Sequence, residues 1–286
     1  MTRPGRGAGG SPAGQPAVAR PVVRGRRAAG YPVAPHTLPP DDIASGRYSL
    51  TFARSMEQLR SLQRLRFEVF NLELGEGFDS SFESGLDQDD LDEAMHHLLI
   101  VDTSTGLAVG TYRMQTAAMA AANCGFYSAR EFDISAFPFA VVDDAVEVGR
   151  ACIARTHRNR RVLHLLWRGL AQYLTWTGKH LLFGCCSLTT QDGRIGNEVH
   201  ARLVDGGHLH PEVRAWPLPG YECGLHGHGT PPAEPFEIPP LFQSYLNLGA
   251  RICGPPAVDR EFGTIDFLVV LDVRQLESHV YRSFFG

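Results

Sequence analysis

A basic turn, Arg155–Arg161, has the clearest pattern for anion binding in this sequence. It lies between an expected buried strand at 145–153 and a helix whose apolar positions begin at Val162. A helix N-terminus presents unpaired N–H groups and a positive dipole end, and arginine adds paired donors for phosphate or carboxylate. The turn has no glycine to wrap a pyrophosphate, so it predicts a site for a single phosphate or an acidic protein surface; a solvated helix start remains the alternative. The residues expected to bind there are Arg155, His157, Arg158, Arg160 and Arg161.

Two charged residues, Glu147 and Arg150, interrupt the expected strand at 145–153. Charged side chains are seldom buried without a partner, because removing them from water is costly. Their odd spacing would place them on opposite faces of a regular strand, but Gly149 makes a bulge plausible. The pair is therefore predicted to be a site ion pair or to include a general base, and a structural salt bridge is the alternative.

A third group combines arginines and aspartates. Arg66 and Arg113 occur among apolar residues. An acidic stretch supplies four aspartates: Asp87, Asp89, Asp90 and Asp92. Carboxylates could hold the ammonium group of an amino acid while arginine holds its carboxylate. The alternative for the acidic stretch is a solvated surface.

The cysteines and histidines do not predict a metal site. Cys223, His226 and His228 lie close together, but no second ligand pair has the usual spacing for zinc. Cys185 and Cys186 follow an apolar run and are expected to be small core residues. Without a C-x-x-C pair or a signal sequence, the six cysteines fit a reducing cytoplasm.

The elements that must position these residues alternate between helices and strands. Apolar spacing predicts a helix over 56–74 that ends at Gly75, and a hairpin of strands at 97–101 and 108–116. Such a mixture predicts an α/β layer fold. The remaining expected elements are a strand at 49–53, a helix at 162–177, a strand at 181–188, helices at 194–204 and 241–248, and a strand at 264–273.

Charge and composition limit the remaining function classes. Residues 1–40 contain six arginines and no acid, so a disordered basic tail is expected over 1–45 and a single domain over 46–286. The whole chain has 27 basic and 31 acidic residues, which disfavours nucleic acid as a partner. No apolar run reaches the roughly 18 residues needed to cross a bilayer, so we expect a cytoplasmic protein with at most peripheral contact at the inner face of the membrane.

A series of segments resembles, in order and spacing, the ornithine N-acyltransferases of lyso-ornithine lipid synthesis, a family of the GNAT superfamily related to the acyl-homoserine-lactone synthases. The resemblance covers roughly residues 48–275. The matching segments are Leu65–Phe70, Asp87–Asp92, Val109–Arg113, Gly125–Ser128, Glu131–Asp133, Glu147–Arg150, Leu166–Leu170, Leu182–Cys185, Tyr245–Ala250, Gly254–Pro256, Asp259 and Asp266–Val269.

The resemblance implies a GNAT-like α/β fold with a mixed, largely antiparallel central sheet, splayed strands and flanking helices. The core would span about 48–190, with a C-terminal extension over about 191–286. The implied reaction moves a 3-hydroxy fatty acyl group from acyl carrier protein, through its phosphopantetheine, to the α-amino group of ornithine. No separate cofactor is implied.

The resemblance also implies roles for individual residues. Glu147 and Arg150 would be catalytic, with Glu147 as the general base. The same donor acting on another amino acid, a polyamine or S-adenosylmethionine is one alternative, and a non-catalytic module that docks carrier protein or membrane is another. The residues implied to bind the acceptor are Arg66, Phe70, Asp89, Asp92 and Arg113.

Overall fold

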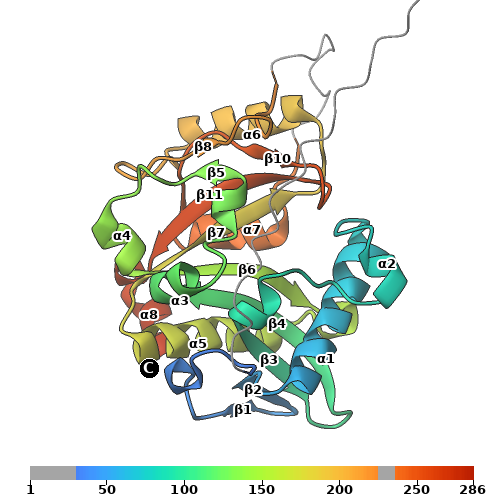
Figure 1. The fold of residues 1–286 in the computed structure, drawn as a ribbon. Coiled ribbons are helices and arrows are strands. Elements are labelled where there is room, and N and C mark those ends of the chain that lie inside the picture. The colour runs from blue at the N-terminus through green and yellow to red at the C-terminus, as the bar shows by residue number, and fades with distance from the viewer. Residues whose placement is uncertain (1–29, 225–235) are drawn as a thin grey trace, which may run out of the picture.

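The computed structural model describes residues 30–224 and 236–286, and one twisted sheet extends through them (Figure 1). The strand order is β1-β2-β3-β4-β6-β7-β11-β10, and β9 also pairs with β11. Neighbouring strands are antiparallel, except that β6 and β7 are parallel. The strands are β1 Ile43–Ser45, β2 Tyr48–Phe52, β3 His96–Asp102, β4 Leu107–Thr116, β6 Ala145–Ile153, β7 Leu181–Leu188, β9 Arg251–Ile252, β10 Ala257–Asp259 and β11 Thr264–Asp272, and β5 Phe132–Asp133 pairs with β8 Trp216–Pro217 in a small second sheet.

Helices cover both faces of the large sheet. The longest, α5 (Arg160–Thr177), buries its apolar stripe against Leu98 and neighbouring strand residues, as the spacing of its leucines predicts. Side chains alternate between the faces of a strand, so Leu99 points the other way and packs under α1 (Met56–Phe67). The other helices are α2 Ser81–Ser84, α3 Ala117–Ala122, α4 Phe139–Asp143, α6 Gly193–Asp205, α7 Pro240–Asn247 and α8 Ser278–Phe285, with a π-helical segment at Glu68–Leu74 and 3-10 turns at Pro35–Thr37, Asp92–Ala94, Ser128–Arg130, Arg155–His157 and Val273–Gln275.

The central strands β6 and β7 separate after a short stretch of pairing. They are hydrogen-bonded only from Ala145 to Glu147 on β6, opposite Leu181 to Phe183 on β7. At the point of separation, a Cβ on Gly184 would lie 2.1 Å from the carbonyl oxygen of Val148. Glycine therefore allows the two backbones to touch there, and both strands continue beyond it unpaired with each other.

These observations confirm the predicted α/β class, with its largely antiparallel sheet and splayed central strands. The expected disordered tail over 1–45 is wrong for its last part, because residues 30–45 pack on the body; for example, the carbonyl of Val33 lies 2.7 Å from Nε2 of His96. Residues 1–29 of that tail lie outside the described part of the chain. Strand β11, from the expected extension, pairs with β7 over its length.

No helix within residues 30–224 and 236–286 is both long enough and apolar enough to cross a bilayer.

Candidate active site

A cavity of about 700 Å³ occupies the gap between β6 and β7. Its apolar walls come mainly from α5, α7 and the separated strands, and include Leu166, Trp167, Leu182 and Tyr245. Its charged walls come from β4, β6, β11 and the segment after α1. The charged side chains that line these walls include Glu76, Arg113, Glu147, Arg150 and Asp266.

The basic turn borders one end of this cavity, where Arg158, Asn159 and Arg160 line it. Asn159 caps α5, because its side chain accepts hydrogen bonds from the backbone N–H groups of Arg161 and Val162. Arg158 forms a bidentate ion pair with Glu73, at 2.7 and 2.8 Å. The turn therefore places Arg158 and Arg160 at the opening between the strands, and Arg155 and Arg161 are exposed beside them in the sequence.

A β-bulge re-aims Arg150. The pairing of β4 with β6 shifts between Thr111 and Arg113, and Arg150 takes a left-handed backbone with φ of 50°. Its guanidinium lies over the rings of Phe262 and Phe78, 4.3 and 5.0 Å from their centroids. The bulge predicted near Gly149 is present, and the strain of a positive φ falls on a residue that lines the cavity.

Behind the cavity lies an arginine–aspartate network made of Arg66, Asp87, Asp89, Asp92 and Arg113. Arg66 donates to Asp92 at 2.6 and 2.9 Å and lies 2.7 Å from Asp87. Arg113 donates to Asp89 at 2.6 and 2.7 Å and to Asp92 at 2.9 Å. Each of these buried charges therefore has a partner of opposite sign within the protein.

The network keeps Asp89 and Asp92 ionised. Burial alone would raise the pKa of Asp92, but the charges of Arg66 and Arg113 outweigh burial, and its pKa lies well below the usual value. The same balance, with Arg113 as the main partner, lowers the pKa of Asp89. Because Arg66, Asp89 and Asp92 do not line the cavity, the geometry gives them a positioning role in place of the expected direct contact with substrate.

Glu147 lines the cavity, and four hydrogen bonds fill its carboxylate. Oε1 accepts from the backbone N–H and the hydroxyl of Ser128, at 2.8 and 2.7 Å. Oε2 accepts from Gln115 at 2.7 Å and from the backbone N–H of Tyr127 at 2.9 Å. Glu147 thus holds the turn at Ser128–Arg130 against the sheet, and both oxygens have few lone pairs left for a further proton.

The predicted ion pair between Glu147 and Arg150 is wrong. The bulge points Arg150 toward Asp87 and Asp89, each 3.5 Å away, while Glu147 faces the turn at Ser128–Arg130. Of the seven residues carried over from the family resemblance, four line the cavity: Phe70, Arg113, Glu147 and Arg150.

A pair of buried carboxylates, Glu131 and Asp266, was not predicted from the sequence to belong to the site. One carboxylate oxygen of Glu131, one of Asp266 and the Sγ of Cys185 all lie within 4.8 Å of one another. Asp266 and Cys185 line the cavity. A signal was present, because Asp266 interrupts an apolar strand and charged residues are seldom buried there without purpose. The sequence also contains a group that could be considered as zinc ligands, namely Cys223, His226 and His228. Both histidines lie outside the described residues, since 225–235 are not among them.

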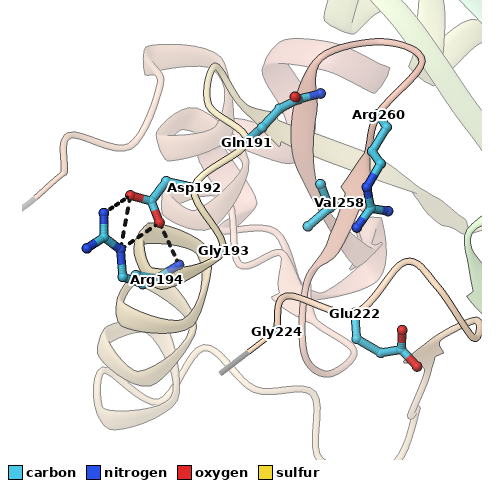
Figure 2. Close-up of a pocket in the computed structure, with 8 residues that line it drawn as sticks. All are labelled: Gln191, Asp192, Gly193, Arg194, Glu222, Gly224, Val258 and Arg260. Atoms are coloured by element: carbon cyan, nitrogen blue, oxygen red, sulfur yellow. Dashed lines mark hydrogen bonds and ion pairs between the residues drawn. The ribbon is translucent and has the colours of Figure 1, made fainter. Parts of the chain in front are cut away.

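A smaller pocket of about 290 Å³ lies at the start of α6, beside β10 (Figure 2). Arg194 there donates hydrogen bonds to the carboxylate of Asp192, two residues before it in the sequence (Figure 2). None of the predicted site residues lines this pocket. The larger cavity between β6 and β7 is therefore the candidate active site.

Comparison with known proteins gives matches over most of the chain. Residues 65–168 match the family described as an acetyltransferase (GNAT) domain. The L-ornithine N(alpha)-acyltransferase of Brucella abortus (strain 2308) is 30% identical over 258 residues, which cover 84% of this chain and 89% of that protein. The protein of the same name from Agrobacterium fabrum (strain C58) is also 30% identical over 258 residues, covering 84% and 86%.

Two solved structures also match this chain, at low sequence identity. FeeM, an N-acyl amino acid synthase from uncultured soil microbes, has a TM-score of 0.48 and 11% identity, with 81% of this chain and 95% of that chain covered. The AHL synthase LasI has a TM-score of 0.45 and 14% identity, with 85% and 96% covered.

Proposed function

Because this chain belongs to the family of L-ornithine N(alpha)-acyltransferases, we propose that it moves a 3-hydroxy fatty acyl group from acyl carrier protein to the α-amino group of ornithine. The product would be lyso-ornithine lipid. The acyltransferase activity follows from the family, and the donor, acceptor and product are the proposal.

One observation carries the proposal: the cavity joins an apolar wall to a charged wall through the gap between β6 and β7. The unpaired backbone edges of the two strands can hydrogen-bond the amides of an extended pantetheine arm. A fatty chain can lie along Leu166, Trp167 and Tyr245, while a charged amino acid meets the opposite wall. Holding both reactants at one point supplies much of the rate enhancement of a bimolecular reaction.

The basic turn supports acyl carrier protein as the donor. Carrier protein presents its phosphopantetheine phosphate on an acidic surface, which the exposed arginines of Arg155–Arg161 would complement. Since no glycine occurs between these residues, the backbone lacks the loop that would wrap a pyrophosphate. The turn also borders the cavity, so the arm would enter directly between the strands.

The chemistry is a direct attack of the neutral amine on the thioester carbonyl. The C–N bond forms as the oxygen becomes negative, the C–S bond then breaks, and the thiol of the carrier leaves with a proton while the amine loses one. Oxyanion donors are available from the unpaired edge of β6 that begins at Val148. Just after β6, the backbone N–H of Ala154 donates to the carbonyl of Val109 and is therefore not free for the oxyanion. The oxyanion donors would lie nearer the bulge at Arg150.

The residues of the site assign two further roles. We place Glu147 as the residue that positions the turn at Ser128–Arg130, because its four hydrogen bonds leave it little capacity as a base. Burial raises the pKa of the Cys185 thiol well above its usual value, which argues against an acyl-cysteine intermediate.

The test is a transfer assay with purified protein, 3-hydroxyacyl carrier protein and ornithine, in which mass spectrometry detects the acylated product. We expect N-acyl-ornithine, with acyl-coenzyme A of the same chain a poorer donor. Equal or faster transfer from acyl-coenzyme A would refute acyl carrier protein as the donor. Acylation of other amines but not of ornithine would refute ornithine as the acceptor.

A further inference from the structure

Glu131 and Asp266, the acidic pair, come from distant parts of the chain and meet at the charged wall of the cavity. Glu131 follows the turn at Ser128–Arg130, and Asp266 lies on β11 opposite Ser187 of β7. Both are 3% exposed. Asp266 lines the cavity, and one ligand atom of Glu131 lies within 4.8 Å of one on Asp266.

The acidic pair has no cation. In the described part of the chain, no ion pair includes Glu131 or Asp266, whereas every aspartate of the arginine–aspartate network has an arginine. Oε2 of Glu131 is buried without a hydrogen-bond partner among the described residues, although the carboxyl group as a whole interacts with the side chain of Tyr127. Two adjacent carboxylates buried in this way are unfavourable unless a proton or a cation joins them.

The neighbouring carboxylates have hydrogen-bond donors, as Asp266 has in the hydroxyl of Thr264 at 2.9 Å, whereas Oε2 of Glu131 has none among the described residues. Asp259 accepts backbone N–H bonds from Glu261 and Phe262, both at 2.9 Å, and so fixes the turn after β10. Glu76 accepts a hydrogen bond of 2.6 Å from the hydroxyl of Thr189. Both add negative charge around the acidic pair without offering it a partner.

The ionisation of the acidic pair agrees with a missing cation. Burial, and then the charge of Asp259, raise the pKa of Asp266 to about 6. Burial and the charges of Asp266 and Asp259 raise the pKa of Glu131 well above its usual value. A cation placed between the two carboxylates would lower both pKa values and remove the repulsion.

We propose that Asp266, with the Glu131 carboxyl group held behind it, binds the side-chain ammonium of a diamino acid and so determines the acceptor specificity of the enzyme. This inference rests on the proposed function and adds to it the residues that recognise the second amine. An ammonium group has three donors and no acceptor, which suits two acidic side chains and the unpartnered Oε2 of Glu131.

The sheet geometry favours the second amine over the attacking one. The acyl carbonyl would lie beside β6, and Asp266 lies two strands away, on β11 beyond β7. Paired strands are about 4.8 Å apart, and β6 and β7 are no longer paired beside Asp266, so its backbone lies more than about 10 Å from β6. That distance excludes direct proton removal from the attacking amine, and the short aliphatic chain of ornithine can cross much of it.

The experiment compares ornithine with norvaline, which has the same carbon chain but lacks the second amine. The variants are Glu131→Gln, Asp266→Asn and the double variant, with Glu83→Gln as a control for loss of an exposed carboxylate on α2. We measure kcat/KM for each amino acid with the same acyl carrier protein. We also measure direct binding of ornithine and norvaline by calorimetry without donor.

We expect the wild-type preference for ornithine over norvaline to fall about 10- to 100-fold in each single variant, since one charged hydrogen-bond partner is lost. The loss of preference should appear as a higher KM for ornithine. The kinetics with norvaline should not change, and the Glu83→Gln control should behave like the wild type. A preference that survives in the double variant would refute the inference. A divalent metal that copurifies with the wild type and is absent from the double variant would also refute it.

The binding measurement separates this inference from the proposed function. If the wild type binds ornithine more tightly than norvaline, and the variants lose that difference, the ammonium site holds even if acyl transfer to ornithine is not observed. If the wild type acylates ornithine but the variants keep the binding difference, the proposed function holds and the assignment of Glu131 and Asp266 fails.

Discussion

Ser128 donates two hydrogen bonds to the same oxygen of Glu147: its backbone N–H and its hydroxyl both donate to Oε1, at 2.8 and 2.7 Å. Glu147 belongs to the strand that would hold the acyl donor, and Ser128 begins the turn that leads to Glu131. The carboxylate therefore links the position of the donor strand to the position of one acceptor-binding residue.

Removal of the Ser128 hydroxyl should weaken acceptor binding. Ser128→Ala deletes one buried hydrogen bond to a charged group, which costs about 1.5–3 kcal/mol in free energy of unfolding. We expect KM for the amine to rise more than kcat falls, because the turn that carries Glu131 loses a tether. Urea unfolding and steady-state kinetics measure the two effects.

The control is Ser61→Ala, which removes a hydroxyl hydrogen bond on α1 away from the cavity and should leave KM unchanged. Glu147→Gln distinguishes positioning from base catalysis. A variant that keeps its stability and its KM but loses the acidic limb of the kcat–pH profile would show that Glu147 is the base.

Neutralising exposed arginines of the basic turn should impair the carrier-protein donor selectively. In Arg155→Ala/Arg160→Ala, we expect kcat/KM for acyl carrier protein to fall about 10- to 100-fold, through loss of two charged contacts. Transfer from a small acyl-pantetheine donor should change little. Arg60→Ala, an exposed arginine on α1, is the control, and equal losses with both donors would contradict docking at this turn.

The contact between Gly184 and Val148 should not tolerate a side chain. A Cβ at position 184 would lie 2.1 Å from a backbone oxygen, so Gly184→Ala must push β6 and β7 apart. We expect a loss of about 1–3 kcal/mol in free energy of unfolding or more, with loss of transfer activity. Gly149→Ala, where no atom lies within 4 Å, should keep the wild-type stability; equal stability of both variants would contradict the close contact.

The stability of the protein should depend on pH through Asp266. Its pKa is raised to about 6 in the folded state, so between about pH 4 and pH 6 the folded state binds more protons than the unfolded state. The free energy of unfolding that the Asp266 carboxyl group contributes is fully present below the pKa that it has in the unfolded chain. This contribution is lost as the pH rises through about 6. The acidic groups that interact with Asp266 are Glu131, Asp259 and Glu76.

Asp266→Asn should remove this loss. We expect the free energy of unfolding of the variant, relative to wild type, to increase by about 1–3 kcal/mol between pH 4 and pH 7. Urea unfolding at both pH values measures the difference, with Glu83→Gln as the control. A difference that does not change with pH would show that Asp266 titrates normally.

Local patterns predicted much of the fold. The apolar spacing from Val162 onward, followed by Gly178, predicted α5, and Gly178 takes a left-handed φ of 66° where the helix ends. The charged interruption at Glu147 and Arg150 predicted an irregular strand. These features depend on neighbours in sequence, so the sequence alone contains the necessary information.

Long-range pairing could not be predicted in the same way. The sequence indicated that Arg66 and Arg113 were buried but not that aspartates would satisfy both, and the Glu147–Arg150 pair failed because a bulge turned one partner away. Glu131 and Asp266 are 135 residues apart, since 266 − 131 = 135. Their contact depends on how β11 inserts beside β7, which no local pattern specifies.

The contact between Gly184 and Val148 also has a consequence for how the enzyme would select the length of its acyl chain. Backbone atoms in contact cannot yield, so any arm that enters from the basic turn stops at one fixed depth. The reacting carbon would then lie in the same place for short and long chains alike. Selection for chain length would belong to the far wall formed by Trp167 and Tyr245, where substitutions could change the length of the lipid without altering the chemistry.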